Sequence, residues 1–217
     1  METALQIVIL AAGDFPTHPI PLRALHEADF VVFCDSAYNQ FSILHPQLSI
    51  PFAVIGDGDS LSESDKEALD DHWIKIEEQD YNDLHKAMQY ATTKFPNPNS
   101  RFSILGATGR REDHTIGNIS YLVTFAAEYP DKNIEMLTDY GQFSLVRGSR
   151  TFTSFPRQQV SIFSLKPDSP VTATGLRWPL DKKTLTLWWQ GTLNEALSTT
   201  FYVEGDNILV FQTYDPK

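Results

Sequence analysis

The first two thirds of the chain contain six short apolar runs, and a segment rich in Gly, Asp or other polar residues follows each of them. The runs are Leu5–Leu10, Phe30–Cys34, Phe52–Ile55, His72–Ile76, Phe102–Leu105 and Ile134–Leu137. Continuous apolar runs of this length are typical of strands that are buried on both faces, as in a parallel sheet. This feature restricts the N-terminal part of the chain to an α/β architecture.

Helical periodicity lies between several of these runs. Asn82 is a residue type that caps helices, and apolar residues recur after it at i, i+3, i+4 and i+7, namely Leu84, Ala87, Met88 and Ala91. Residues 113–129 show similar spacing, and Pro130 ends the helix expected there. The alternation of strand, polar turn and helix predicts a Rossmann-like, mostly parallel sheet with flanking helices.

The pattern changes after residue 143, where β-rich runs follow one another without helical periodicity. They are Thr151–Phe155, Val160–Leu165, Val171–Ala173, Thr184–Trp189, Thr200–Val203 and Ile208–Gln212, with turn composition at Lys166–Pro170 and Glu204–Asn207. This pattern predicts a small antiparallel β-sandwich. We therefore expect an α/β domain over residues 1–143 and a β-sandwich over residues 144–217, which suits a chain of 217 residues.

Charge and cysteine content exclude several classes of function. The chain has 17 Lys and Arg against 28 Asp and Glu, a net charge of −11, which argues against a nucleic-acid partner because phosphates are repelled. Cys34 is the only cysteine, so neither an intrachain disulfide nor a thiolate zinc cluster is available, and its apolar run predicts a small buried side chain. We find no secretory signal and no membrane-spanning run, and expect a cytoplasmic protein.

Aspartates gather at the ends of the predicted strands. They are Asp14, Asp35, Asp57, Asp59, Asp80 and Asp83. In open α/β sheets ligands bind at the carboxyl edge of the strands, and several carboxylates there would repel one another unless a cation lay among them. Aspartate oxygens suit Mg²⁺, which takes much of its remaining shell from phosphates. The alternative is that these aspartates only form turns and cap helices.

Two glycine-bearing loops are the most specific local signals. In Gly56-Asp57-Gly58-Asp59 two carboxylates, at i and i+2, can converge on one ion, although the flanking residues fit neither an EF-hand nor a dinucleotide fingerprint. The segment from Gly106 to Arg111 follows a strand and precedes a helix, so its amides and arginines suit a phosphate. An ordinary strand-to-helix turn remains the alternative for this second loop.

Tryptophan is concentrated in the β-rich part, at Trp178, Trp188 and Trp189. Packing in a core is one reading of these residues. A flat aromatic platform for a heterocycle or a cation is the other.

Taken together, these motifs resemble the thiamine pyrophosphokinase family. The matching stretches run in family order, namely Cys34–Ala37, Ile55–Ser60, Gln79–Ala87, Leu105–Thr115, Gly175–Leu180 and Thr192–Asn194. The resemblance implies an α/β catalytic domain followed by a β-sandwich. It also implies a homodimer with active sites shared between subunits, and transfer of pyrophosphate from ATP to thiamine, giving thiamine diphosphate and AMP with the help of Mg²⁺.

The resemblance also implies roles for individual residues. It assigns Mg²⁺ to Asp57, Asp59 and Asp83, and thiamine to Gln79, Trp178 and Asn194. It assigns the nucleotide to Asp35, Gly106, Thr108, Gly109, Arg110, Arg111, Asp113 and His114. In the reaction, either Asp83 or Asp80 takes the proton of the thiamine hydroxyl, and Arg111 offsets charge on the transferred group.

Three positions depart from the family pattern. Arg110 replaces the second glycine of the usual Gly-Gly-Arg, Asn82 replaces a threonine, and Leu193 replaces a serine. Two alternatives stay open, the first because the same acidic residues would serve it and the second because Arg110 and Leu193 depart from the pattern. One is a different Mg²⁺-dependent phosphotransferase or phosphohydrolase, and the other is a nucleotide- or thiamine-binding protein without turnover.

Overall fold

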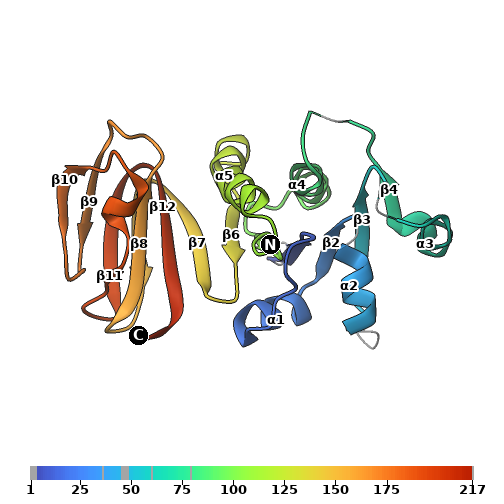
Figure 1. Ribbon diagram of the computed structural model, residues 1–217, viewed down its shortest axis with the longest axis horizontal. Helices are drawn as coiled ribbons and strands as arrows, with labels where there is room; N and C mark the ends of the chain where they lie inside the picture. Colours follow the sequence, from blue (N-terminus) through green and yellow to red (C-terminus); the bar gives the residue numbers. More distant parts are fainter. Residues whose placement is uncertain (1–3, 36, 45–48, 60, 79, 217) are drawn as a thin grey trace. The chain divides into compact units, whose positions relative to one another are not determined.

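The structure is a computed structural model that describes residues 4–35, 37–44, 49–59, 61–78 and 80–216. The chain divides into two compact units, residues 1–139 and residues 140–217, which we call the N-terminal and C-terminal units and describe separately (Figure 1). The expected boundary at residue 143 lies inside a strand that begins at Gly141.

The N-terminal unit contains a parallel sheet, as the apolar runs predict. Its strands are β1 (Gln6–Leu10), β2 (Phe30–Cys34), β3 (Phe52–Gly56), β4 (Trp73–Lys75), β5 (Arg101–Leu105) and β6 (Asn133–Leu137). Their order is β6-β5-β1-β2-β3-β4, and every pairing among them is parallel. Strand β2 is buried throughout, and β1, β3 and β5 are buried after their first residue. This agrees with strands that are covered on both faces.

Helices connect these strands. They are α1 (Pro19–His26), α2 (Ala37–Leu44), α3 (Glu63–Leu69), α4 (Asp83–Lys94) and α5 (Glu112–Glu128), with a 3₁₀ turn over Asp70–His72. In Figure 1, α1 and α2 lie on one side of the sheet, and α4 and α5 lie on the other. The predicted cap of α4 is confirmed, because the Asn82 side chain accepts a hydrogen bond of 3.1 Å from the His85 amide. Helix α5 ends just before Pro130, as expected.

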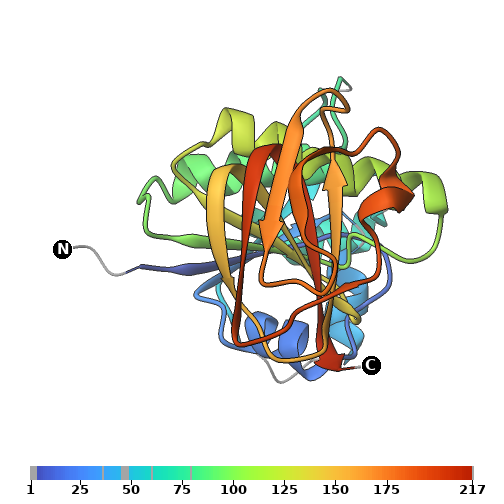
Figure 2. The same cartoon turned by 90° about the vertical axis from the view of Figure 1, so that its left-hand side faces the viewer.

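The C-terminal unit is built from antiparallel strands. They are β7 (Gly141–Thr153), β8 (Gln158–Ser164), β9 (Pro170–Thr174), β10 (Leu180–Thr184), β11 (Asn194–Glu195) and β12 (Thr200–Pro216). Strand β12 pairs with β7 over most of its length, and the two long strands run side by side in Figures 1 and 2. On its other edge β12 pairs with β9 near its start and with β8 near its end.

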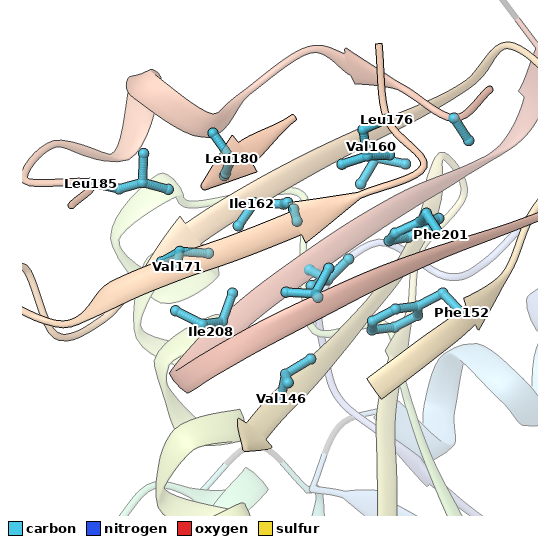
Figure 3. Close-up of a cluster of buried hydrophobic side chains, with 14 residues drawn as sticks. Val146, Phe152, Val160, Ile162, Val171, Leu176, Leu180, Leu185, Phe201 and Ile208 are labelled. Carbon is cyan, nitrogen blue, oxygen red and sulfur yellow. The ribbon is translucent and has the colours of Figure 1, made fainter. Parts of the chain in front are cut away.

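One apolar core fills the C-terminal unit (Figure 3). Its members come from all the longer strands of the unit and from the connections between them. Phe152 and Phe201 stack with ring centroids 4.9 Å apart, and both side chains are buried.

Two expectations for the C-terminal unit are wrong. Thr184–Trp189 was expected to be a strand, but strand β10 ends at Thr184 and a 3₁₀ turn forms over Trp188–Gly191. The two runs around Glu204–Asn207 belong to one strand, β12, which carries a register shift between Asp206 and Ile208. Asn207 has φ 53° there. The turn-like composition therefore marks a bulge, which needs the same residue types as a turn.

Within the described residues, no helix is both long and apolar enough to span a membrane.

Candidate active site

A cavity of about 680 Å³ lies in the N-terminal unit, beyond the carboxyl ends of the central strands. Its lining comes from the segment after β1, from the end of β2, and from the starts of α4 and α5. The chain order of the sheet reverses between β1 and β5, because β1 to β4 run outward in one direction and β5 and β6 lie on the other side of β1. Ligands of open α/β sheets bind at such a reversal.

The loops after β1 and β5 contact each other directly. The Gly13 amide donates to the Gly106 carbonyl at 2.7 Å, and the Asp14 amide donates to the Thr108 carbonyl at 3.0 Å. A Cβ atom at Gly13 would lie 2.3 Å from the Gly106 oxygen and 2.5 Å from the Thr108 oxygen. Only glycine therefore permits this close approach of the two loops.

The loop after β5 contains three residues with left-handed backbone. They are Gly106 (φ 62°), Gly109 (φ 79°) and Arg110 (φ 54°). Arg110 thus adopts the conformation of the glycine that the family pattern has here, at a cost of roughly 1–2 kcal/mol. Its guanidinium donates to the Ala12 carbonyl at 2.7 Å and lies 3.9 Å from the Asp14 carboxylate. The arginine therefore ties the loop after β5 to the loop after β1.

Arg111 and Asp113 form a two-pronged ion pair at the start of α5. Arg111 donates to both carboxylate oxygens of Asp113, from Nε at 3.1 Å and from Nη2 at 2.6 Å. The pair raises the pKa of Arg111 and lowers the pKa of Asp113. The His114 amide also donates to Asp113, at 2.9 Å. All three residues line the cavity, and one edge of the Arg111 guanidinium is engaged by Asp113.

Three of the expected aspartates share one electrostatic environment. Burial raises the pKa of Asp83, and the carboxylates of Asp35 and Asp57 raise it further, while Lys86 opposes the rise. The Lys86 ammonium is 3.6 Å from Asp83 and is almost fully buried. Asp35 is also buried, and it packs against Gly56, where a Cβ atom would lie 2.9 Å from the Asp35 Cβ. Asp35 and Asp83 line the cavity.

Asp59 adjoins this group through Asp57, whereas Asp80 is placed by a separate contact. Asp59 donates its amide to the Asp57 carboxylate at 3.1 Å, and neither residue lines the cavity. Asp80 is exposed and donates its amide to the Glu78 carboxylate. In the part of the chain that the structure describes, no three His, Cys, Asp or Glu side chains stand together in a ready-made metal site. Gln79 lies outside the described residues.

Trp178 and Asn194 lie in the C-terminal unit and contact each other. The Asn194 amide donates to the Trp178 carbonyl at 2.6 Å and accepts from the Trp178 amide at 3.1 Å. Asn194 is buried, whereas 56% of Trp178 is exposed. Asn194 therefore fixes the backbone that presents the indole ring. Leu193, next to it, is exposed and has φ 59°.

Core packing is the wrong reading of the three tryptophans in the C-terminal unit. Trp178, Trp188 and Trp189 are all more than half exposed within this chain. The Arg177 guanidinium lies over the Trp178 ring, 5.1 Å from its centroid. The face of this indole therefore accommodates a cation.

Several residues that line the cavity are not among those predicted from the sequence, above all Asn118 and Tyr121. The Asn118 amide donates to the Ala107 carbonyl at 2.8 Å and accepts from the Asn82 side chain at 3.3 Å. A usable signal was present, because His114, Gly117, Asn118 and Tyr121 recur at i, i+3, i+4 and i+7 on one face of α5. Cys34, which is buried as expected, also lines the cavity.

The fold and the cavity define the class of the N-terminal unit as a doubly wound α/β protein with a cavity at its switch point. Residues 22–136 match the family described as thiamin pyrophosphokinase, catalytic domain, and residues 141–211 match its substrate-binding domain. The chain belongs to the thiamin pyrophosphokinase family.

Individual relatives agree with this assignment. Thiamine pyrophosphokinase 1 and thiamine pyrophosphokinase 3 of Oryza sativa subsp. japonica are 28% and 30% identical to this chain over 178 residues. Each match covers 76% of this chain but only 64% and 63% of the two rice proteins. The chain thus spans less than two thirds of the length of these curated relatives.

Solved structures share the fold. The yeast thiamin pyrophosphokinase superposes with a TM-score of 0.80 at 15% identity, covering 98% of this chain and 88% of that one. A thiamin pyrophosphokinase family protein from Enterococcus faecalis gives 0.77 at 21% identity, covering 96% and 99%. These likenesses confirm the mixed α/β fold with a mostly parallel N-terminal sheet and antiparallel C-terminal strands.

Proposed function

We propose that this protein is an enzyme that transfers pyrophosphate from ATP to the hydroxyl group of thiamine, giving thiamine diphosphate and AMP. The observation that carries the proposal is the composition of one cavity at the switch point. It brings the buried carboxylate of Asp35 and the half-buried carboxylate of Asp83 together with the arginines of the loop after β5. This combination suits an anionic substrate that arrives with a cation, in a chain that belongs to the thiamin pyrophosphokinase family.

The nucleotide binds along the loop from Gly106 to Arg111 and the start of α5. Left-handed residues in this loop allow close approach of an anion, and the first turn of α5 adds partial positive charge. Arg110, Arg111 and His114 face the same cavity. We assign the nucleotide to this set, together with Gly106, Thr108, Gly109, Asp35 and Asp113.

The carboxylates fit Mg²⁺ by their chemistry. Asp57, Asp59 and Asp83 supply the oxygen ligands that this ion takes, and one or two protein carboxylates suffice when phosphates complete its shell. The raised pKa of Asp83, to which Asp35 and Asp57 contribute after burial, marks a region where a cation would relieve repulsion. When bound, Mg²⁺ neutralises charge on the polyphosphate and orients it.

In the reaction, the thiamine hydroxyl oxygen forms a bond to the β-phosphorus of ATP, and the bond between that phosphorus and the oxygen that leaves with AMP breaks. Asp83 takes the hydroxyl proton. This role suits Asp83 better than Asp80, because Asp83 lines the cavity and burial raises its pKa, which makes it a stronger base. Arg111 offsets negative charge on the transferred group.

Thiamine is bound by Trp178, with Asn194 and Gln79. The exposed indole offers a flat face to the pyrimidine and to the positive charge of the thiazolium, and Asn194 holds the backbone of Trp178. We propose further that the protein is a cytoplasmic homodimer in which one subunit contributes the aspartates and the other contributes Trp178.

The C-terminal unit acts in this proposal as a β-sandwich. Two observations support that arrangement: β8 and β9 pair with the same edge of β12 at different ends, and side chains from both contribute to one core.

One assay tests the proposed reaction. The purified protein is incubated with ATP, Mg²⁺ and thiamine, and the products are separated by chromatography. AMP and thiamine diphosphate in equal amounts are expected. ADP would indicate another phosphotransferase, free phosphate a phosphohydrolase, and binding without any product a nucleotide- or thiamine-binding protein.

Shared sites are tested by mixing two impaired variants at a thiamine concentration below the raised KM of the Trp178→Ala variant. A Trp178→Ala chain and an Asp59→Asn chain should regain activity together, because one site of the heterodimer then combines two intact halves. Verified heterodimers without activity would refute sharing but would leave the reaction assignment standing.

A further inference from the structure

Every carbonyl group from residue 106 to residue 109 accepts a hydrogen bond from outside the loop after β5. Two donors are amides of the loop after β1, Gly13 to the Gly106 carbonyl and Asp14 to the Thr108 carbonyl. The other two are side chains of α5. Asn118 donates to the Ala107 carbonyl at 2.8 Å, and the Thr115 hydroxyl donates to the Gly109 carbonyl at 3.2 Å.

This arrangement bears on anion binding because a carbonyl oxygen carries negative partial charge. A loop that receives phosphate must keep its carbonyls turned away and its amides available. Since the C=O and N–H of one trans peptide unit point in opposite directions, holding the carbonyls of Ala107 and Gly109 toward α5 fixes the amides of Thr108 and Arg110. Among the described residues, no acceptor is found for the amides of Ala107, Thr108 and Gly109.

The two side-chain donors are placed to act together. Thr115 and Asn118 are three residues apart on α5, so they lie on the same face of the helix. Each reaches back to a different carbonyl of the loop that precedes the helix. Left-handed loop residues are costly for a non-glycine such as Arg110, so the loop needs such restraints to keep one conformation.

We propose that Thr115 and Asn118 are positioning residues that hold the carbonyls of the loop after β5 away from the bound nucleotide. The inference rests on the proposed function. Neither residue needs to touch a phosphate, since each acts through the peptide that it restrains.

The first test compares near-isosteric variants by steady-state kinetics. Thr115→Val and Asn118→Leu remove the donors while keeping the approximate shape, and Thr115→Ser restores a hydroxyl. Loss of either donor should raise the KM for Mg·ATP about five- to tenfold, as expected for one hydrogen bond, and should leave the KM for thiamine within about twofold. Thr115→Ser should remain close to the wild type.

Ser120→Ala is the matched control. Ser120 lies on the same helix, and its hydroxyl also donates to a backbone carbonyl, that of Gly117 at 2.7 Å, but that carbonyl belongs to the helix. This variant should leave both KM values unchanged. Equal increases in the two KM values for Thr115→Val and Asn118→Leu, or a Thr115→Ser variant as impaired as Thr115→Val, would overturn the inference in favour of general destabilisation.

A second measurement does not depend on turnover. Hydrogen–deuterium exchange of the peptide that contains residues 106–111 is followed in the unliganded protein. It should be faster in Thr115→Val and Asn118→Leu than in the wild type and Ser120→Ala. Unchanged exchange in both donor variants overturns the inference, whereas a wild type that makes no AMP but shows the expected exchange differences overturns only the proposed function.

Discussion

The two units use β-structure in opposite ways. In the N-terminal unit the strands are parallel and the central ones are buried on both faces, and the cavity lies beyond the strand ends. In the C-terminal unit the strands are antiparallel, and β8 alternates buried and half-buried residues along its whole length. Its candidate ligand residue, Trp178, lies on a connection between β9 and β10.

Functional residues therefore have different positions in the two kinds of sheet. A parallel sheet gathers the segments after its strands at one edge, so residues far apart in sequence converge predictably. An antiparallel sheet distributes polar residues over an exposed face and its connections, so position along a strand does not single out a site.

The largest effect on turnover is expected when an aspartate of the N-terminal unit is compared with one of the C-terminal unit. Asp59→Asn in the loop after β3 should lower turnover by about 100-fold or more, because metal-mediated charge stabilisation is worth several kcal/mol. Asp168→Asn, in the turn between β8 and β9 of the C-terminal unit, should have no effect. Turnover is measured at saturating substrate, and EDTA should abolish it until Mg²⁺ is returned. A fully active Asp59→Asn enzyme would show that the aspartates after β3 have no part in turnover.

A smaller effect is expected at the exposed tryptophan. Trp178→Ala should raise the KM for thiamine several-fold, since a cation on an aromatic face gains roughly 0.5–2 kcal/mol, and should leave the KM for ATP unchanged. Because Trp178 is 56% exposed, the free energy of unfolding should fall by less than about 1 kcal/mol.

Two variants of the same unit serve as controls for Trp178. Trp189→Ala removes another exposed indole and should leave thiamine kinetics intact. Phe201→Ala removes a fully buried ring that stacks on Phe152 and should cost about 3–5 kcal/mol of stability. A Trp178→Ala variant that behaves like Phe201→Ala would show that the indole packs rather than binds.

A third prediction concerns the pH dependence of stability. The pKa of Asp83 is raised in the folded protein, mainly by burial, so folding disfavours its ionised form. In the unfolded chain Asp83 ionises near the ordinary value of 3.8, and its contribution to stability therefore decreases as pH rises from there through the raised pKa. Asp83→Asn removes this decrease.

Urea unfolding of the unliganded protein, measured at several pH values, checks the sign. The stability of Asp83→Asn relative to the wild type should increase with pH above 3.8 and then level off, while turnover is lost. A relative stability that decreases with pH would mean that the Lys86 pair, 3.6 Å away, outweighs burial.

The smallest effect is a change in stability at two residues with left-handed backbone, one in each unit. Arg110→Gly relieves backbone strain but loses the hydrogen bond to the Ala12 carbonyl, and each term is worth about 1 kcal/mol. The net change in stability should stay within about 1 kcal/mol. Leu193→Gly relieves similar strain at an exposed side chain and should be the more favourable of the two substitutions. Thermal unfolding of both variants measures the difference.

The sequence predicts the N-terminal fold well because its signals are local. Apolar runs mark the buried strands, Asn82 marks the cap of α4, and Pro130 marks the end of α5. In the C-terminal unit local signals mislead. Gly205 and Asn207 resemble a turn, yet β12 passes through them, because pairing with β7 on one edge outweighs the local preference.

Some residues of the candidate site can be predicted from the sequence and others cannot. The strand-end aspartates and the Gly106–Arg111 loop stand out by composition. Asn118 and Thr115 do not, because their importance depends on which face of α5 turns toward the loop, and that is decided by tertiary packing. The β-sandwich and the assigned residue roles stay predictions.

The reactivity of the Cys34 thiol can report on the state of the cavity region. Cys34 lines the cavity, and burial, followed by the charges of Asp83 and Asp35, raises the pKa of its thiol, so the reactive thiolate is scarce in the folded protein. Since the chain has no other cysteine, the rate of alkylation by a maleimide measures how often this region opens. A nucleotide that binds there should slow this alkylation. The dependence of the alkylation rate on nucleotide concentration would then report binding at the site without a substrate analogue.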